Sequence, residues 1–374
     1  MATFFVQKLG SYNFLSYLCT HILIYCKLMK KLLMIAMMLG GAVGCWAQGP
    51  NDSGEYYKAA DGKKGAALKT ALCGIIYNRD EEGADLNAAY KALWTHFQKT
   101  DVRDDGSVWD MYSNKRAMTF VTDQAGNYKQ EGDVYNREHS FPNSWFGGKN
   151  GTMPMYTDLN HLYPTDGYVN NKRANFPFGE TSNPTYKSAN DFSKLGPCSY
   201  PGYTGTVFEP NDEYKGDFAR TYFYMVTCYE EKLADWYQKY ADSQPTLDGN
   251  AYPGLSAWQL EMLMKWAEND PVSEKETNRN NAVFNIQKNR NPFIDYPGLE
   301  AYIWGDKKDV AFSYSDYATE IKGIIERNSE ADDVQPEAIY SPDGKRLMKP
   351  HNGLNIMRLK NGKRVKTVKG FANF

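Results

Sequence analysis

Two clusters of polar residues in this chain together carry the groups that hydrolysis of a phosphodiester requires. The first is the sequence NREH at 136–139, and the second is DLNH at 158–161, which continues to Asn170 and Arg173. A phosphodiester is an anion that resists attack, so its hydrolysis needs an activated nucleophile and positive charge near the phosphate oxygens. The clusters offer an imidazole beside a carboxylate, a distant carboxamide and guanidinium groups, which together suit a metal-assisted phosphodiester hydrolase.

Each residue type has a task in that chemistry. A histidine such as His139, with an ordinary pKa near ~6.5, is partly neutral at physiological pH and can take a proton from water. Mg²⁺ prefers oxygen ligands and keeps several waters, so one carboxylate and one amide oxygen suffice to hold it. Arginine can bind a phosphate oxygen through its forked N–H groups. Because Glu138 and His139 are adjacent, a regular strand would point them to opposite faces, and we expect a bent strand end or a bulge there.

The flanking sequence predicts the elements that position these clusters. Apolar residues recur at helical spacing in the segments 65–77, 85–97, 219–232 and 255–268. Ser273 and Glu276 form the S-x-x-E pattern that begins a further helix. Apolar runs at 109–113 and 118–121 predict strands that lead into the central segment. Residues 181–206 are rich in Ser, Asn, Pro and Gly, which predicts a long surface loop.

The central segment, residues 133–180, resembles the bacterial endonuclease I family, a branch of the His-Me finger (ββα-metal) nucleases. The blocks that carry the resemblance are NREHSFPNSWFG at 136–147, DLNHLYPTDGYVNNKRANFPFGE at 158–180, and similar sequences at 207–225 and 278–297. The resemblance covers roughly residues 55–305 and implies an α+β fold, in which a mixed helical domain contains a ββα-metal finger. It also implies a non-sequence-specific endonuclease that uses Mg²⁺, with Ca²⁺ or Mn²⁺ as alternatives, to cut DNA and often RNA.

The resemblance assigns roles to individual residues. His139 matches the general base that activates water, Glu138 matches the carboxylate ligand of the metal, and Asn170 matches its amide ligand. Arg137 and Arg173 are candidates for phosphate contacts, although the family pattern alone does not say which of them faces the scissile group.

Five further polar residues are functional candidates, and four of them also have a structural interpretation. Arg279, Lys288 and Arg290 form a candidate phosphate-tracking patch, while Arg279 and Arg290 would equally suit a buried polar network that holds the last helix. His161 and Asp158 could be ligands, but we favour structural support of the site, since groups behind metal ligands commonly orient them. Similarly, the acidic turn at 101–106 suits a solvated loop better than a Ca²⁺ site, because its ligand spacing is irregular.

Composition leaves a second class of function open. A net charge of −2 gives no global basic field, although a local groove can be basic on a neutral protein. The 28 Tyr and 8 Trp would suit an exported glycan-binding protein without nuclease activity, because aromatic rings stack on sugars as readily as on bases. A decayed nuclease that only binds DNA is a third alternative. We favour a monomeric enzyme with DNA, and RNA as a further substrate, and with no stable protein partner.

The ends of the chain predict export. A pair of lysines followed by LLMIAMMLGGAVGCWAQ is typical of a signal peptide at 29–47, which makes residues 1–28 an upstream extension. An uncleaved anchor or lipoprotein processing at Cys45 are alternatives to secreted or periplasmic release. After an acidic linker at 327–338, residues 339–374 alternate apolar and polar residues around Gly-containing turns, which predicts a β-rich C-terminal tail.

That tail is similar to those of exported Gram-negative proteins, some of which are sorting signals. It is also basic, so binding to nucleic acid or to an anionic surface is open. Three cysteines, Cys73, Cys198 and Cys228, follow the leader. They allow one disulfide and one free thiol in an oxidising compartment, and their spacing specifies no pairing.

Overall fold

The computed structural model describes residues 51, 53–77, 85–148 and 154–314, and four short segments at 336–341, 346–347, 353–359 and 364–369. The chain divides into two compact units, Met1–Ser315 and Asp316–Phe374. The predicted signal peptide at 29–47 and Cys45 lie outside the described residues. Within the described part, no helix combines the length and apolar character that a membrane span needs.

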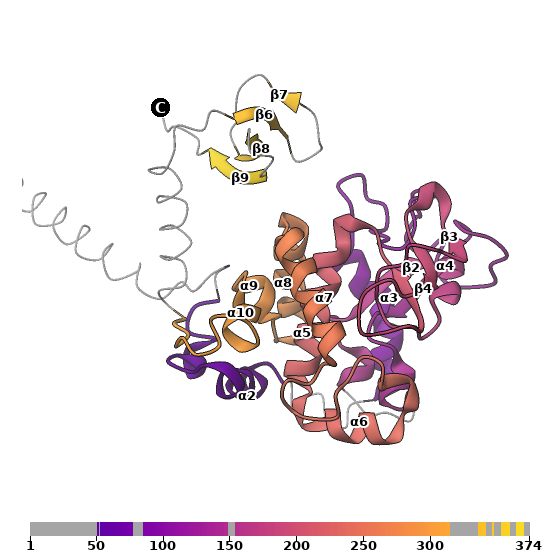
Figure 1. The fold of residues 1–374 in the computed structure, drawn as a ribbon. Helices are drawn as coiled ribbons and strands as arrows, with labels where there is room; N and C mark the ends of the chain where they lie inside the picture. Colours follow the sequence, from indigo (N-terminus) through magenta and orange to yellow (C-terminus); the bar gives the residue numbers. More distant parts are fainter. Residues whose placement is uncertain are drawn as a thin grey trace, which may run out of the picture. The chain divides into compact units, whose positions relative to one another are not determined.

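The expected α+β class is confirmed, because the first unit combines helices with small antiparallel sheets (Figure 1). Its α-helices are α2 (Gly65–Ile76), α3 (Leu86–Thr100), α4 (Gly167–Arg173), α5 (Lys215–Cys228), α6 (Leu233–Lys239), α7 (Ala257–Asn269), α8 (Glu274–Gln287), α9 (Pro292–Asp295) and α10 (Leu299–Ile303). Its strands are β1 (Tyr135–His139), β2 (Leu162–Asp166), β3 (Tyr186–Lys187), β4 (Lys194–Pro197) and β5 (Thr206–Glu209). Strand β1 pairs with β2, and a second sheet has the order β3-β4-β5.

Helix α5 is the central element of this unit. Every residue from Gly216 to Cys228 is buried, which fits a helix that is apolar and aromatic on nearly all sides. It packs against α7, α2 and α9, and Figure 1 shows α7 beside it. The burial of α5 makes it a rigid support for the polar groups that contact it from the β1–β2 side.

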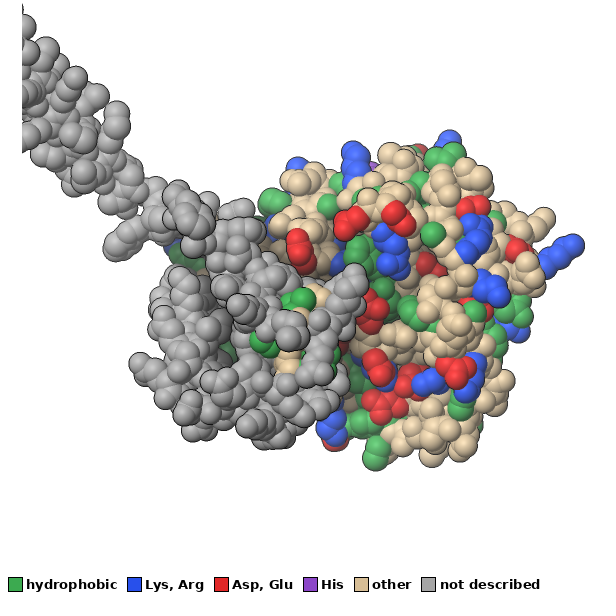
Figure 2. All heavy atoms as spheres, turned by 90° about the horizontal axis from the view of Figure 1, so that it is seen from above, with side chains coloured by type: hydrophobic (Ala, Val, Ile, Leu, Met, Phe, Trp, Pro, Cys, Tyr) green, Lys and Arg blue, Asp and Glu red, His purple; other side chains and the backbone are tan. Residues whose placement is uncertain are grey.

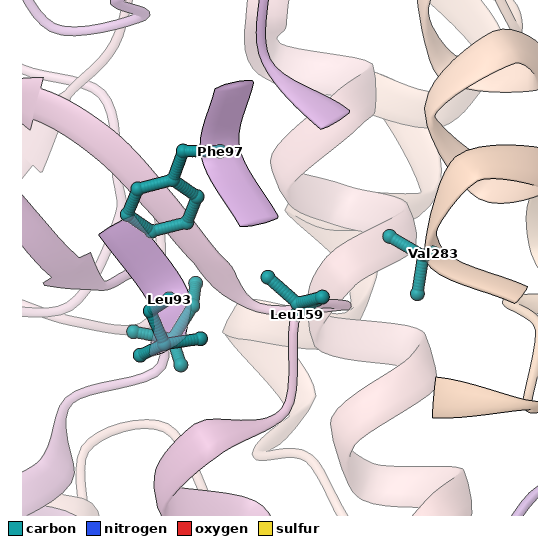
Figure 3. Close-up of a cluster of buried hydrophobic side chains, with 5 residues drawn as sticks. Leu93, Phe97, Leu159 and Val283 are labelled. Atoms are coloured by element: carbon teal, nitrogen blue, oxygen red, sulfur yellow. The ribbon is translucent and has the colours of Figure 1, made fainter. Parts of the chain in front are cut away.

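Helix α3 is fixed by a small hydrophobic cluster (Figure 3). Leu93 and Phe97 lie four residues apart on one face of α3 and pack with Leu159, Leu162 and Val283. At the start of the helix, Asp85 accepts hydrogen bonds from the backbone N–H groups of residues 87 and 88. The cluster ties α3 to α8 and to the segment that enters β2, and so places α3 alongside the β1–β2 pair.

The central segment forms a ββα unit. Strand β1 runs antiparallel to β2 with the register Tyr135↔Asp166 through His139↔Leu162. Helix α4 follows β2 directly, and Asp166 caps it by accepting hydrogen bonds from the N–H groups of Tyr168 and Val169. The register is continuous over these five pairs, so the bulge that we considered at Glu138 and His139 is absent from them.

Two predictions of local structure were wrong. The segments 109–113 and 118–121 are irregular, because carboxylates take backbone donors that a strand would use. Asp110 accepts from the Tyr112 N–H at 2.8 Å, and Asp123 accepts from the Thr119 N–H at 2.7 Å. Conversely, the predicted loop at 181–206 contains β3 and β4 and reaches β5.

The second unit contains the predicted β-rich tail. Its strands are β6 (Pro336–Tyr340), β7 (Arg346–Leu347), β8 (Gly353–Leu359) and β9 (Arg364–Lys369). They pair antiparallel in the order β7-β6-β8-β9, as alternating residues separated by Gly-containing turns predict. Most of the predicted linker at 327–338 lies outside the described residues.

Asp110 gives the fold a pH dependence that can be tested. Burial, with repulsion from Asp166, raises the pKa of Asp110 to about 8. The folded chain therefore keeps a proton that the unfolded chain releases near pH ~4, and this contribution to stability is present at low pH and lost as the pH rises towards 8. Urea unfolding at pH 5 and pH 8 should show a larger loss of stability in the wild type than in Asp110→Asn. Equal losses in both proteins would contradict this assignment.

Candidate active site

A pocket of about 300 Å³ lies between the end of β1 and the C-terminal half of α4. It brings together four of the predicted site residues, namely Arg137, Glu138, His139 and Asn170. The remaining lining residues are Tyr90, Pro142, Asn143, Ser144, Ala174 and Asn175. Glu138 and His139 both reach this pocket because His139 is the last residue of β1, where the strand gives way to the turn at Pro142.

The hydrogen bonds of His139 define its tautomer. Its Nε2 lies 2.9 Å from the carbonyl oxygen of Tyr156, and a carbonyl only accepts, so Nε2 carries the proton. The unprotonated Nδ1 accepts a hydrogen bond from the Asn143 side-chain nitrogen at 3.3 Å, and both residues line the pocket. Burial, reinforced by His161, lowers the pKa of His139 to about 3, so the ring is neutral at physiological pH. The Nδ1 lone pair, which here accepts from Asn143, is therefore the basic site of the ring.

Glu138 lies beside His139 in a more enclosed setting. Its Oε1 accepts hydrogen bonds from the Tyr112 hydroxyl at 2.9 Å and from Arg173 at 2.8 Å, and the Asn170 side chain also bonds the carboxylate. Burial raises the pKa of the Glu138 carboxyl, while Arg173 and these hydrogen bonds favour its ionised form. One carboxylate and one carboxamide thus meet at the pocket wall, and both supply the oxygen ligands that Mg²⁺ prefers.

Arg173 is a support for Glu138 and not a wall of the pocket. Its side chain is 1% exposed, and it donates to Glu138, to the carbonyls of His139 and Ser140, and to the Tyr222 hydroxyl. These contacts engage its guanidinium inside the protein. Arg173 is therefore not placed to contact a phosphate in the pocket, contrary to what the resemblance suggested. Arg173 instead fixes the carboxylate and the end of β1.

Arg137, unlike Arg173, is accessible from the pocket. It is half-buried, lines the pocket, and lies between two aromatic rings of α3, with its guanidinium carbon 3.5 Å from the Tyr90 ring centre and 4.4 Å from that of Trp94. Its Nη1 donates to the Tyr90 carbonyl at 2.6 Å. Figure 2 shows basic and acidic side chains interspersed over one face of the described residues, without a broad basic field. Among the residues that line the pocket, Arg137 is the one that carries a positive charge.

Asp158 and His161 lie behind the site. The Asp158 carboxylate accepts from the Tyr224 and Tyr229 hydroxyls at 2.6 and 2.7 Å, so it joins the core to α5. The His161 ring centre is 5.5 Å from that of His139, and its Nε2 donates to the Met155 carbonyl. Neither residue lines the pocket, which agrees with the structural interpretation.

The predicted phosphate-tracking patch is not assembled. Arg279 is 6% exposed and pairs with Asp101, and Arg290 is 3% exposed and pairs with Asp295. Only Lys288 of the three is exposed, and it donates to the carbonyl of Asn285 at the end of α8. The structure therefore favours the buried-network alternative for the two arginines, because a guanidinium satisfied by a buried carboxylate cannot also follow a backbone phosphate.

Several residues of the site carried no sequence signal strong enough to single them out. Tyr112 and Tyr222, which bond Glu138 and Arg173, belong to segments that look like ordinary aromatic core. Asn143, Ser144 and Asn175 line the pocket. Asn143 lies four residues after His139, within the matching block, so its proximity to the base was the one detectable signal.

Neither the Ca²⁺ site nor the disulfide that the sequence left open forms in the described part of the chain. No group of three or more His, Cys, Asp or Glu side chains there is placed to hold a metal ion. Asp101, in the acidic turn considered for Ca²⁺, is committed to Arg279. Cys73, Cys198 and Cys228 are all free thiols.

Comparison with known proteins agrees with this geometry. An extracellular ribonuclease of Bacillus amyloliquefaciens is 35% identical over 258 residues, which is 68% of this chain and 79% of that protein. An Endonuclease-1 of Buchnera aphidicola is 29% identical over 139 residues, covering 37% of this chain and 46% of the relative. An extracellular deoxyribonuclease of Aeromonas hydrophila is 27% identical over 143 residues, with 38% and 50% covered.

Residues 64–298 match the family described as Endonuclease I, and this span contains the whole ββα unit and every residue that lines the pocket. The match covers more than half of the chain, and the ribonuclease relative extends over two thirds of it. This protein belongs to the endonuclease I family and is a nuclease.

Proposed function

We propose that this protein is an exported endonuclease that hydrolyses phosphodiester bonds of both DNA and RNA without sequence specificity. The observation that carries the proposal is the unprotonated Nδ1 of His139, in a pocket that Glu138 and Asn170 also line. Relatives named as ribonucleases and deoxyribonucleases support a substrate defined by the backbone phosphate and not by the sugar.

In the proposed reaction, Nδ1 of His139 takes a proton from a water molecule that attacks the phosphorus. The P–O bond to the leaving oxygen breaks as the new P–O bond forms. The hydrogen bond from Nε2 to the Tyr156 carbonyl keeps the ring in the required tautomer and stabilises the imidazolium that results. Arg137 neutralises charge on the phosphate oxygens at the mouth of the pocket.

The residues present fit one divalent ion. Tyr112 and Arg173 both bond Oε1 of Glu138, which leaves Oε2 outside these two contacts. The Asn170 amide nitrogen bonds the carboxylate, and its amide oxygen is a second, neutral donor for an ion. Glu138 and Asn170 would hold the ion, and Mg²⁺ would supply positive charge to the phosphate. Ca²⁺ or Mn²⁺ would suit the same oxygen ligands, since both accept carboxylate and carbonyl donors.

Digestion of supercoiled plasmid and of a long RNA tests this function. We expect nicking and then fragmentation of the plasmid, degradation of the RNA, and loss of both activities in EDTA with recovery on addition of Mg²⁺. DNA that shifts on a gel but stays intact would contradict a nuclease and favour a DNA-binding remnant. Cleavage that persists unchanged in EDTA would contradict the metal.

The proposed ligands predict a loss of metal affinity. Glu138→Gln and Asn170→Ala each remove one oxygen donor or its charge, so each should weaken Mg²⁺ binding by at least roughly tenfold. Isothermal titration of Mg²⁺ into the folded variants measures this directly. Asn175→Ala, which changes a carboxamide on the same pocket wall, is the matched control and should leave the titration unchanged. Wild-type curves for both ligand variants would refute the assignment.

Export and domain boundaries form part of the proposal. The signal-like sequence at 29–47 and relatives named as extracellular and periplasmic support release from the cytoplasm. We assign the nuclease domain to residues 55–305, a linker to 327–338 and an appendage to 339–374. We propose a monomeric enzyme, since one chain supplies a complete proposed site and the reaction requires no second subunit.

A further inference from the structure

The way in which Arg137 is held points to a role in the reaction, and this inference rests on the proposed function. Arg103 lies over the Trp109 ring and donates to the Asp110 carbonyl. Five other arginines of the described region pair with carboxylates: Arg116, Arg173, Arg220, Arg279 and Arg290. Arg137 is held differently, by the Tyr90 and Trp94 rings and by one backbone carbonyl. Such contacts orient a guanidinium without neutralising its charge.

The geometry of α3 explains this arrangement. Tyr90 and Trp94 lie four residues apart, so they share one face of the helix. On β1, Tyr135, Arg137 and His139 alternate with Asn136 and Glu138, and all three contact rings of α3. The neighbouring Leu93 and Phe97 anchor α3 in the core. Helix α3 thus forms a fixed aromatic wall along the catalytic face of β1.

We propose that Trp94 and Tyr90 of α3 are positioning residues that clamp the Arg137 guanidinium toward the substrate phosphate. A carboxylate partner would orient Arg137 equally well but would cancel the charge on which the phosphate depends. The carbonyl of Tyr90 fixes Nη1, and the two rings restrict the plane of the guanidinium. The clamp therefore keeps a full positive charge preorganised at the pocket mouth.

A double-mutant cycle in the full-length protein tests the clamp. We expect Trp94→Leu to lower kcat/KM on a long DNA roughly three- to tenfold through the lost cation–π contact. Arg137→Met should lower it on the order of a hundredfold, as loss of one charge-stabilising group does. Trp94→Leu added to Arg137→Met should cause no further fall, because its effect acts through Arg137. Trp94→Phe should restore most of the activity, since it keeps an aromatic face.

Phe120→Leu is the matched control. Phe120 packs against Tyr135, as Trp94 does, with ring centres 5.9 Å apart, but it is not part of the contact with Arg137. The Phe120→Leu variant should be destabilised to a similar extent as Trp94→Leu, but its kcat/KM should equal that of the wild type. If Trp94→Leu does not fold, Tyr90→Leu takes its place in the cycle.

The outcomes separate the clamp from the proposed function. Additive losses in the cycle, or an equal fall in kcat/KM for Phe120→Leu, would overturn the clamp and leave a purely structural role for Trp94. A wild-type protein that cleaves neither DNA nor RNA would instead overturn the proposed function.

Discussion

His139→Ala should lower the rate of plasmid nicking by about 10² to 10⁴-fold, which is the range that general-base catalysis contributes. The substitution removes the Nδ1 lone pair and leaves water as the base. Glu138 keeps its bonds to Tyr112 and Arg173 in this variant, so Mg²⁺ binding should persist. Initial rates at saturating Mg²⁺, with a parallel metal titration, measure both effects.

His96→Ala is the matched control for that experiment. His96 is also a histidine, on α3, but it lines a separate cavity beside α8 and not the catalytic pocket. Its substitution should leave the nicking rate within about twofold of wild type, since surface changes away from a site are usually small. A His139→Ala variant that nicks as fast as His96→Ala would show that another group is the base.

Arg279→Ala should destabilise the fold by about 3–5 kcal/mol, because it leaves the Asp101 carboxylate buried without its partner. Arg279 donates to both oxygens of Asp101 and to the carbonyls of Leu159 and Leu162, so the loss also opens the segment that enters β2. Chemical denaturation at neutral pH measures the free energy of unfolding.

Lys288→Ala also tests whether the residues of the predicted phosphate-tracking patch have a structural or a functional role. Lys288 belongs to the predicted phosphate-tracking patch but is exposed, so its removal should change stability by at most about 0.5 kcal/mol. An Arg279→Ala protein as stable as Lys288→Ala, with weakened binding to DNA, would restore the functional interpretation of the patch.

The sequence predicted most of the helical frame because periodicity and capping are local signals. Ser273 and Glu276 do form a capping box at the start of α8, and the apolar spacing at 85–97 marks most of α3. Four of the residues that line the pocket, Arg137, Glu138, His139 and Asn170, came from the matching blocks, whose order sets Asn170 on a helix after the second strand. Local pattern and family order thus sufficed for these features.

What the sequence could not predict depends on contacts between distant segments. The partner of Arg279 is Asp101, which lies 178 positions away, and no local pattern joins them. Similarly, Arg173 looked available for a phosphate until α4 placed it against Glu138 and Tyr222. The strands expected at 109–113 failed because the Asp110 side chain captured a backbone donor, and that choice depends on burial around it.

Anomalous diffraction from a Mn²⁺-soaked crystal is the most direct measurement of the site. The account predicts one strong peak in the pocket, roughly 2.0–2.3 Å from a Glu138 oxygen and the Asn170 amide oxygen, as expected for such an ion. The Nδ1 of His139 should lie outside that coordination shell, free to contact water. A Mn²⁺ ion bound through His139, or bound away from Glu138 and Asn170, would contradict it.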